Sequence, residues 1–466
     1  MTNRKPLHQR LIEKPRDFVY NQVILTAQAF ARIEASSGMV LLIAALAALI
    51  WANSSWDDSY FELLHTPITI DADIVHLDLT LQHWINDGLM AIFFFLMGLE
   101  IKRELVHGEL STPRRALLPA AAALGGMIVP ALVFTAFNAG GEGAHGWGIP
   151  VATDIAFALG VLSLLSRRVP FSIRVFLLAL AIADDIGGIL VIAIFYTSDI
   201  SFSAMAIAGL LVAVTYVLNR AGVRSITVYV VLGALLWVAV HESGIHATIG
   251  GVVLGLLTPA LPYYNPETFA ESAEDLANRY RTALQAGATA VQESLLSQME
   301  DLVQGTEAPL ERIERALVGW VSFTIVPIFA LANAGVAISG NVASDAVTSP
   351  VSQGVVLGLM LGKPVGIFLF TFLAVKLGIC DMPRGATWSH VLGVGLLGGI
   401  GFTVALLITD LGFRGQPVLA DDAKLGVLAA SLAAAVLGTA FLFFVGLSSP
   451  DTQNASEEAR PIASNT

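Results

Sequence analysis

Four ionisable residues lie inside long apolar segments of the chain: Asp154, Asp184, Asp185 and Lys363. A charge at the centre of a membrane helix costs about 2.5–3.5 kcal/mol on insertion scales, so the four cost on the order of 10 kcal/mol together. Three acids against one base leave a surplus of two negative charges, which protons or a bound cation must balance. A buried ion-pair network that only fixes helix packing is the alternative interpretation.

Asp184 and Asp185 are consecutive in the chain. On a helix their side chains point about 100° apart, so they cannot both face the same way. One of them can pair with Lys363 on a distant segment while the other faces a cavity.

Asp154 stands in the sequence Ile-Pro-Val-Ala-Thr-Asp. Pro150 removes a backbone donor and interrupts a helix, and Thr153 offers a hydroxyl beside the carboxylate. Carboxylate, hydroxyl and carbonyl oxygens suit small hard cations. The sequence has no Cys/His cluster for zinc or copper and no spacing typical of haem, so we expect no cofactor.

A second interruption is predicted at Gly398, Gly399 and Gly401, in Leu-Gly-Gly-Ile-Gly-Phe-Thr. This interruption lies in the middle one of the last three predicted membrane spans. Asp154 lies in the middle one of an earlier group of three spans, and that group has the opposite topology. Two interrupted spans at matching positions of inverted repeats indicate the midplane site of a secondary transporter. Glycines alone are weak evidence, because small residues also let helices pack closely.

The elements that position these residues are predicted membrane helices. Hydrophobic residues make up 55% of the 466 and charged residues 13%, with a mean hydropathy of +0.72, which is typical of a polytopic helical membrane protein rather than a soluble one. A net charge of −12 argues against a nucleic acid partner.

About 20 apolar residues span a bilayer. Twelve segments qualify: 33–52, 84–101, 117–137, 148–165, 171–197, 202–219, 225–240, 244–260, 319–337, 351–375, 391–410 and 423–447.

Basic residues predict the orientation of these spans, because cytoplasmic loops retain Lys and Arg. With the arm 1–32 in the cytoplasm, 22 of the 25 Lys and Arg residues fall on the cytoplasmic side and two outside, and Lys363 lies within a span. We therefore expect both termini in the cytoplasm, the tail 448–466 as a disordered cytoplasmic segment, and no cleavable signal peptide.

Two polar excursions separate the spans, which otherwise occupy 33–260 and 319–447. The external segment 53–83 has six acids and no Lys or Arg, and its alternation predicts a β-hairpin around residues 71–73. The cytoplasmic loop 261–318 has ten acids and four bases. Apolar residues at helical spacing predict an amphipathic helix there, which Gly287 weakens. These residues are Leu276, Tyr280, Leu284, Ala288, Val291, Leu295 and Met299.

The chain resembles the NhaA family of bacterial sodium/proton antiporters. The likeness runs through nearly the whole membrane portion and rests on short segments in the family's order. They are residues 95–105 (FLMGLEIKREL), 125–132 (GGMIVPAL), 152–162 (ATDIAFALGVL), 179–187 (ALAIADDIG), 243–248 (SGIHAT), 329–336 (FALANAGV), 362–367 (GKPVGI) and 399–403 (GIGFT).

The resemblance implies roles for the intramembrane residues. Asp185 is implied as the main Na⁺ or Li⁺ ligand, with Asp184 either beside it in the cation site or bridged to Lys363. Asp154 and Thr153 are implied at the crossing of two broken helices, where Asp154 offsets the opposed helix ends. The coupled proton belongs either to Asp184 or to Lys363.

The resemblance also implies electrogenic exchange in the inner membrane, more than one H⁺ per Na⁺ or Li⁺, active at neutral to alkaline pH and working by alternating access. Candidates for the pH response are Glu100, Arg103, Glu104, Glu314 and His246, for which a structural role at a helix end is the alternative. The hairpin near 68–82 resembles the family's external dimer contact, so we expect a homodimer among membrane lipid.

The sequence departs from the family at a few places. Residues 264–310 exceed the usual loop length, and Arg315 and Val318 stand where some members have histidines, which bears on the pH profile.

Other functions are less consistent with the sequence. An intramembrane aspartyl protease needs Gly-x-Gly-Asp, which is absent, so we expect no enzyme. A channel would use rings of charges or carbonyls from several subunits. A proton-coupled exchanger of K⁺ or of an organic ion stays as the alternative.

Overall fold

The computed structural model describes residues 36–72, 75–165, 168–197, 200–223, 225–338 and 345–447. The predicted arm 1–32 and tail 448–466 lie outside the described residues. The chain divides into two compact units. The first comprises Met1–Asn53, Pro119–Asp184 and Ala334–Thr466, and the second comprises Ser54–Leu118 and Asp185–Asn333.

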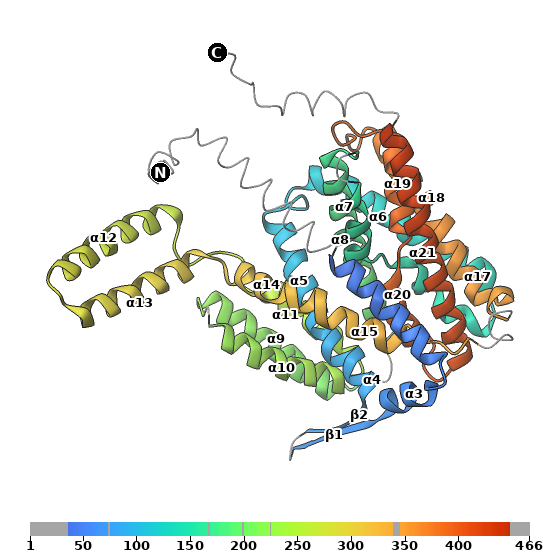
Figure 1. The fold of residues 1–466 in the computed structure, drawn as a ribbon, viewed down its shortest axis with the longest axis horizontal. Coiled ribbons are helices and arrows are strands. Elements are labelled where there is room, and N and C mark those ends of the chain that lie inside the picture. Colours follow the sequence, from blue (N-terminus) through green and yellow to red (C-terminus); the bar gives the residue numbers. More distant parts are fainter. Residues whose placement is uncertain are drawn as a thin grey trace, which may run out of the picture. The chain divides into compact units, whose positions relative to one another are not determined.

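Apolar helices dominate the described part of the chain (Figure 1). Seven helical segments in it are long and apolar enough to cross a membrane, three bent helix pairs qualify as broken or re-entrant spans, and two apolar helices are shorter. These twelve elements follow the order of the twelve predicted spans. The two short helices, α10 (Ile226–Glu242) and α11 (Ala247–Leu257), occupy the seventh and eighth predicted spans.

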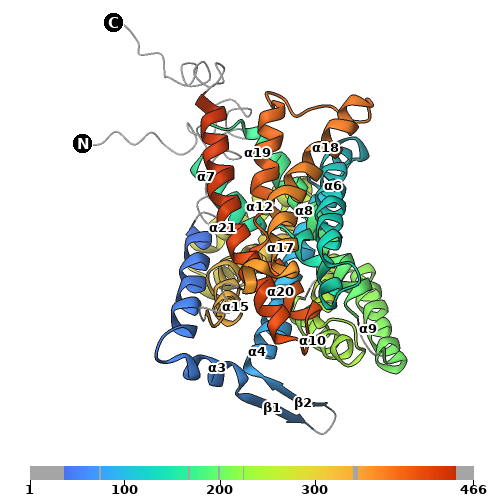
Figure 2. The same cartoon turned by 90° about the vertical axis from the view of Figure 1, so that its right-hand side faces the viewer.

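The first unit contains the helix Ser36–Ala52 and two of the three bent helix pairs. Its other elements are α6 (Pro113–Asn138, from Pro119), the 3₁₀-helix η2 (Glu142–Val151), α7 (Ile155–Leu164), α8 (Phe171–Phe195, to Asp184), α17 (Pro350–Leu357), the π-helical turn η4 (Gly358–Gly362), α18 (Lys363–Lys376), α19 (Trp388–Gly398), α20 (Phe402–Gly412) and α21 (Pro417–Leu447). Helix α19 packs between α18 and α21 (Figure 2). Val391, Val394 and Leu397 of α19 are completely buried there.

The second unit is built on a close pair of helices, α5 (Met90–Val106) and α11. Small residues let their backbones meet: a Cβ on Gly255 would lie 2.7 Å from the carbonyl oxygen of Phe95. The unit's other elements are α3 (Asp57–His65), α4 (Leu81–His83), the π-helical turn η1 (Trp84–Leu89), α9 (Phe202–Arg220), α10, α12 (Pro266–Gln285), α13 (Thr289–Thr306), α14 (Pro309–Trp320), the π-helical turn η3 (Val321–Ile325) and α15 (Val326–Asn333).

The predicted hairpin is present as strands β1 (Pro67–Ala72) and β2 (Val75–Thr80). They pair antiparallel, with Ile68 opposite Leu79 and Ile70 opposite Leu77. The hairpin turn at residues 73 and 74 lies outside the described residues. These are the strands of the described part of the chain, so the fold is essentially all-α.

The loop 261–318 differs from the predicted single amphipathic helix, because α12 and α13 form a helical hairpin. Gly287 lies between them with φ of +66°, a conformation that side chains with a Cβ rarely adopt. The hairpin has a small core of its own, made of Leu276, Ala283, Leu295 and Leu302. The next span begins at Pro309, ten residues before the predicted start at 319, because α14 continues through η3 into α15.

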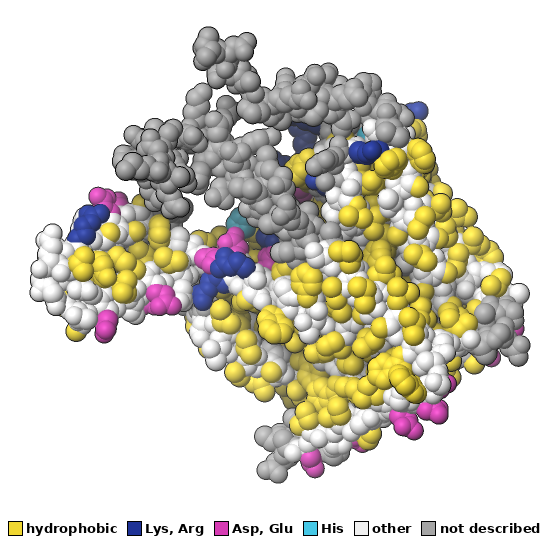
Figure 3. Space-filling model, viewed as in Figure 1, with side chains coloured by type: hydrophobic (Ala, Val, Ile, Leu, Met, Phe, Trp, Pro, Cys, Tyr) yellow, Lys and Arg dark blue, Asp and Glu magenta, His cyan; other side chains and the backbone are white. Residues whose placement is uncertain are grey.

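The space-filling view shows how side-chain types are distributed on one face (Figure 3). Apolar side chains cover the spans on this face, whereas charged ones gather on α12 and α13 and at the ends of the spans. Many large apolar side chains of the spans are exposed, among them Leu210 at 63% and Leu132 at 63%. Such a surface is expected where lipid rather than water surrounds the helices.

Candidate functional site

Both predicted interruptions are present, and both lie in the first unit. The axes of η2 and α7 differ by 44° across a break at residues 152–154. The axes of α19 and α20 differ by 46° across a break at residues 399–401. A break in a membrane helix leaves amide and carbonyl groups that other protein atoms must satisfy.

The two breaks satisfy each other's backbone groups. The amide of Asp154 donates to the carbonyl oxygen of Ile400 at 2.6 Å, which joins one break directly to the other. The hydroxyl of Thr153 donates to the carbonyl oxygen of Gly398, the last residue of α19, at 3.0 Å. The interrupted spans therefore cross at residues 153–154 and 398–400.

The carboxylate of Asp154 caps two helices at once. Its Oδ1 accepts from the amide of Phe157 in α7 at 3.0 Å. Its Oδ2 accepts from the amide of Thr403 at 3.2 Å and from the Thr403 hydroxyl at 2.8 Å, in the first turn of α20. Asp154 is 3% exposed, so its negative charge lies buried at two positive helix ends. Thr403 belongs to a segment that carries the family resemblance, but no role for its hydroxyl was predicted from the sequence.

The glycines at the second break are needed for close approach rather than for unusual backbone angles. Gly399 has a φ of −68° and Gly401 one of −91°, both open to any residue. A Cβ on Gly399 would lie 2.6 Å from the carbonyl oxygen of Leu359, and one on Gly401 would lie 3.2 Å from that of Ala152. At Gly398 the nearest atom is the flexible end of the Ile367 side chain, at 3.0 Å.

Lys363 and Asp184 form a buried ion pair. The Nζ of Lys363 lies 2.6 Å from Asp184 Oδ2, and the two residues are 1% and 2% exposed. Lys363 Nζ also donates to the carbonyl oxygen of Val151, the last residue of η2. The lysine thus places a positive charge at the negative end of η2, while Asp154 places a negative charge at the following helix start.

The π-helical turn η4 ends immediately before Lys363. Such turns insert an extra residue into a helix and occur frequently at functional sites. A π-helical turn also contains Asp87, in η1. Neither turn was predicted from the sequence, which shows no periodicity signal for one inserted residue.

Asp185 follows Asp184 on α8 and is also buried, at 6% exposed. Helical geometry turns its side chain about 100° away from that of Asp184. Asp184 is paired with Lys363, and three aspartates against one lysine leave the formal surplus of two negative charges that the sequence indicated. Cations or protons are the mobile charges that can balance it.

Several candidates for the pH response come together in the second unit, where α5 contacts α14. The guanidinium of Arg103 donates to Glu314 Oε1, and its Nε lies 4.0 Å from Glu104 Oε1. Glu104 Oε2 accepts from the amide of Glu109 at 2.9 Å, which closes the end of α5. Glu100 lies one turn earlier on the same helix. Glu314 belongs to helix α14, whereas the prediction had placed it in the loop 261–318.

His246 lies directly before α11 and is 6% exposed. Its Nε2 lies 3.5 Å from Asp87 Oδ1, and its Nδ1 is hydrogen-bonded to the hydroxyl of Thr248 at 2.9 Å. The pairing of His246 with Asp87 was not predicted, because the two residues lie on spans far apart in the sequence.

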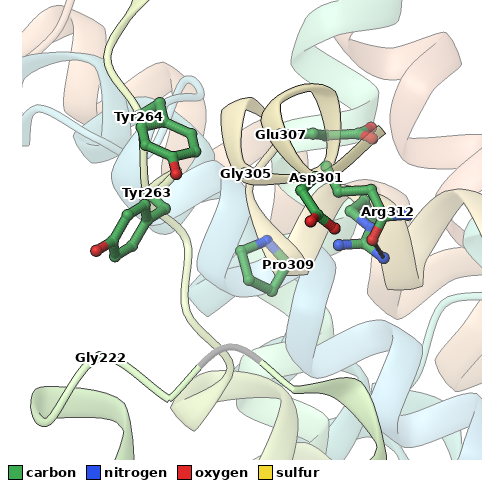
Figure 4. Close-up of a pocket in the computed structure, with 9 residues that line it drawn as sticks. Gly222, Tyr263, Tyr264, Asp301, Gly305, Glu307, Pro309 and Arg312 are labelled. Atoms are coloured by element: carbon green, nitrogen blue, oxygen red, sulfur yellow. Dashed lines mark hydrogen bonds between the residues drawn. The ribbon is translucent and has the colours of Figure 1, made fainter. Parts of the chain in front are cut away.

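A pocket of about 350 Å³ lies at the base of the α12–α13 hairpin (Figure 4). Tyr263, Tyr264, Asp301, Glu307 and Arg312 line it. The amides of both tyrosines donate to the carbonyl oxygen of Gly305, at 2.8 and 3.0 Å, and so close the hairpin. Glu307 is held by the guanidinium of Arg315. The pocket therefore belongs to the connection between hairpin and span, and it contains none of the intramembrane charges.

Comparisons with known proteins agree with this geometry. The family model described as Na+/H+ antiporter 1 matches residues 28–442. The Na(+)/H(+) antiporter NhaA 2 of Syntrophotalea carbinolica is 47% identical over 88% of this chain and 94% of its own. The Na(+)/H(+) antiporter NhaA of Wolinella succinogenes is 47% identical over 89% and 92%, and the NhaA 1 of Myxococcus xanthus is 44% identical over 96% and 98%.

Among solved structures, the sodium proton antiporter MjNhaP1 of Methanocaldococcus jannaschii aligns over 91% of this chain and 98% of its own. Its TM-score is 0.49 and its sequence identity 14%. The assignment rests instead on the family model and on relatives near 47% identity over most of both chains. The chain therefore belongs to the NhaA family of Na+/H+ antiporters.

Proposed function

We propose that this protein is an electrogenic antiporter that extrudes Na⁺ or Li⁺ in exchange for more than one H⁺. The observation that carries the proposal is the buried charge at the broken helices: Asp154, Asp184 and Asp185 against Lys363 alone. Such a surplus is expensive at membrane depth unless a transported cation or proton neutralises it.

Asp185 is the proposed main cation ligand, as the family resemblance implies, and Asp184 beside it forms an ion pair with Lys363. Asp154 then has a positioning role, since both of its carboxylate oxygens accept hydrogen bonds from helix starts. Sodium and protons compete for the same desolvated carboxylate oxygens. A site open to one side binds the cation and releases protons, and open to the other side it does the reverse.

Activity is proposed at neutral to alkaline pH, with the response at the cytoplasmic end of α5. Arg103, Glu104 and Glu314 form the contacts described above, and Glu100 lies on the same helix. His246 and Asp87 form a second titratable pair in the same unit. A change of charge at either group alters the packing of α5 against α11 or α14.

The proposed location is the inner membrane of a bacterium, with both termini in the cytoplasm and lipid around the spans. The hairpin of β1 and β2 is the proposed contact of a homodimer, because Ile68 and Ile70 are exposed on it at 40% and 48%. The relatives of this chain are named as antiporters, which supports transport rather than enzymatic activity.

The test is an assay on everted membrane vesicles from a bacterial strain without antiporters of its own. Respiration acidifies the lumen, and NaCl, LiCl or KCl is then added while a dye reports the pH gradient. Rapid loss of the gradient with Na⁺ and Li⁺ at pH 8, abolished by Asp185→Asn, is the expected result. Asp58→Asn is the matched control, because Asp58 is an exposed acid of α3.

A response to KCl alone would indicate a K⁺ exchanger instead. No response to any of the three cations would leave a proton-coupled exchanger of an organic ion. Activity that survives Asp185→Asn would place the cation ligand elsewhere.

A further inference from the structure

The hairpin of α12 and α13 has exposed apolar residues beside its own core. Each of the four residues of the hairpin core described above is followed in the chain by a second apolar residue. We call these four followers the apolar strip: Ala277 and Leu284 on α12, and Leu296 and Val303 on α13. Leu284, Leu296 and Val303 are 59%, 51% and 58% exposed, so the rest of the chain does not cover them.

The two halves of the apolar strip lie on the same side of the hairpin. Successive residues of an α-helix are about 100° apart, so each strip residue lies to one side of the core residue before it. Helices α12 and α13 pack against each other and reverse direction at Gly287 (Figure 1). In two right-handed helices that face each other and run in opposite directions, this step leads to the same side of the pair. The strip is therefore one surface along the pair, like the open third side of a three-helix bundle.

The spacing along the strip suits a further helix. Ala277 and Leu284 are seven residues apart on α12, and so are Leu296 and Val303 on α13. Seven residues is the repeat of apolar positions in coiled-coil packing. Helix α13 has 18 residues, which corresponds to a length of about 27 Å. A helix of similar length, with apolar residues at the same repeat, can pack against both halves of the strip.

Acidic residues border the apolar strip on the side away from the core. The residues three or four positions from a strip residue on that side are Glu274, Arg281, Glu293, Glu300 and Glu307. Glu307 is held by the guanidinium of Arg315. Glu274, Glu293 and Glu300 are exposed and form no ion pair with any described residue. The border thus has a surplus of negative charge, which a basic partner neutralises.

This charge disfavours two other occupants of the strip. The proposed orientation places the hairpin in the cytoplasm, where the inner leaflet is anionic and repels acidic side chains. A second copy of the hairpin would bring the same acids opposite one another, and like charges at a contact disfavour association. A helix with apolar residues on one face and basic residues along its edges is complementary both to the strip and to its border.

We propose that the α12–α13 hairpin is a docking site for a basic amphipathic helix of another cytoplasmic protein. The apolar face of that helix packs against the apolar strip and completes a three-helix bundle. Its Lys or Arg residues pair with the bordering glutamates. The inference rests on the proposed orientation of the spans and is independent of the proposed antiport.

The first experiment measures peptide binding to the full-length protein in phosphatidylcholine nanodiscs. The probe is a synthetic helix as long as α13, with leucine on one face and lysine along both edges, labelled for fluorescence anisotropy. Saturable binding of one peptide per chain is expected. A version with glutamate in place of lysine is expected not to bind. Binding of neither peptide, or equal binding of both, would overturn the proposal.

A variant of the strip tests the place of binding. Leu296→Asp puts a charge in the apolar contact and is expected to weaken binding of the lysine peptide about tenfold or more. Val291→Asp is the matched control, because Val291 is 50% exposed but lies five residues from Leu296, about 140° around α13. Its affinity is expected to equal that of the native protein. Equal weakening in the two variants would contradict docking on the strip.

A charge reversal tests the border independently of the apolar contact. Glu293→Lys with Glu300→Lys is expected to lose the lysine peptide and to bind the glutamate peptide instead. The control is Glu271→Lys with Asp301→Lys, which changes the net charge equally at two exposed acids outside the border. This control is expected to keep the native preference. The same behaviour in both double variants would show that net charge alone attracts the peptide, which would overturn the proposal.

The second experiment identifies the occupant in living cells. A photoreactive amino acid is incorporated at position 296, and mass spectrometry locates the adducts after irradiation. An adduct on a basic amphipathic helix of another protein is the expected result. An adduct on lipid, an adduct on a second copy of this chain, or no adduct at all would overturn the proposal. Neither experiment measures transport, so failure of the proposed antiport function would leave both results unchanged.

Discussion

The ammonium group of Lys363 lies 2.6 Å from Asp184 Oδ2, and neither residue is more than 2% exposed. The same ammonium group donates to the carbonyl oxygen of Val151 at the end of η2. One side chain therefore joins three elements of the first unit: α18, α8 and the first broken span. This contact gives Asp184 of the doublet a positively charged partner within the protein.

Removal of one partner of this pair is expected to destabilise the protein strongly. Lys363→Met leaves a buried carboxylate without its cation, a loss of about 3–5 kcal/mol for buried pairs. The double variant Lys363→Met with Asp184→Asn is expected to recover most of that loss, because no buried charge remains unpaired. Thermal unfolding in detergent measures both. Lys376→Met, at an exposed position, is the control, and a double variant no more stable than Lys363→Met would contradict the expectation.

The hydroxyl of Thr403 is expected to matter through Asp154. Thr403→Val keeps the side-chain shape but removes the 2.8 Å hydrogen bond to the carboxylate, worth about 1.5–3 kcal/mol for a charged acceptor. Thr403→Ser retains the hydroxyl and is expected to stay close to the native protein. Maximal transport rate and thermal stability of the two variants provide the comparison. Equal behaviour of valine and serine would show that the amide of Thr403 alone caps α20.

Much of this arrangement could be predicted from the sequence, and particular residues show why. Charges inside membrane spans are rare. In the sequence itself, four charged residues therefore stand out from their apolar neighbours: Asp154, Asp184, Asp185 and Lys363. The two breaks are visible as Pro150 and a glycine run. The choice of Asp184 as the partner of Lys363 required the structure or the family resemblance, since the rotation of α8 decides it.

Other features left little or no sequence signal. The contacts between Asp154 and Thr403 and between His246 and Asp87 join residues on distant spans. Pairings of this kind depend on three-dimensional packing and leave no local pattern. The loop 261–318 was predicted as one helix because apolar spacing continues across Gly287, although the positive φ of that residue ends α12.

The two adjacent glycines at the second break are expected to differ in their tolerance of alanine. A Cβ on Gly399 meets the backbone oxygen of Leu359 at 2.6 Å, which cannot move without shifting η4. A Cβ on Gly398 meets only the end of the Ile367 side chain, which can rotate. We expect Gly399→Ala to cost about 1–3 kcal/mol and most of the activity, and Gly398→Ala clearly less. Transport and thermal unfolding of both variants test the order, which a reversed ranking would refute.

The two opposite charges of the Arg103–Glu314 ion pair are expected to be interchangeable between the two positions. Arg103→Glu places a third carboxylate beside Glu104 and Glu314, and like charges at a partly buried contact separate α5 from α14. The reciprocal double variant Arg103→Glu with Glu314→Arg restores opposite charges. Its pH profile in everted vesicles is expected to return towards the native one, whereas the single variant should differ from it. A double variant as impaired as the single one would argue that the contact has no role.

The single cysteine, Cys380, provides a test of both chemistry and orientation. It lies between α18 and α19, where burial and the neighbouring Asp381 raise the pKa of its thiol. A raised pKa lowers the fraction of reactive thiolate at pH 7, so maleimide labelling is expected to be slower than for a free cysteine. The rate should then rise about tenfold for each pH unit below that pKa.

The same residue tests the proposed topology, because the segment between α18 and α19 is expected in the cytoplasm. A membrane-impermeant maleimide should label Cys380 in everted vesicles and not in intact cells, and Cys380→Ser should abolish the signal. Labelling after solubilisation and denaturation serves as the measure of total cysteine. Labelling in intact cells alone would invert the orientation of α19.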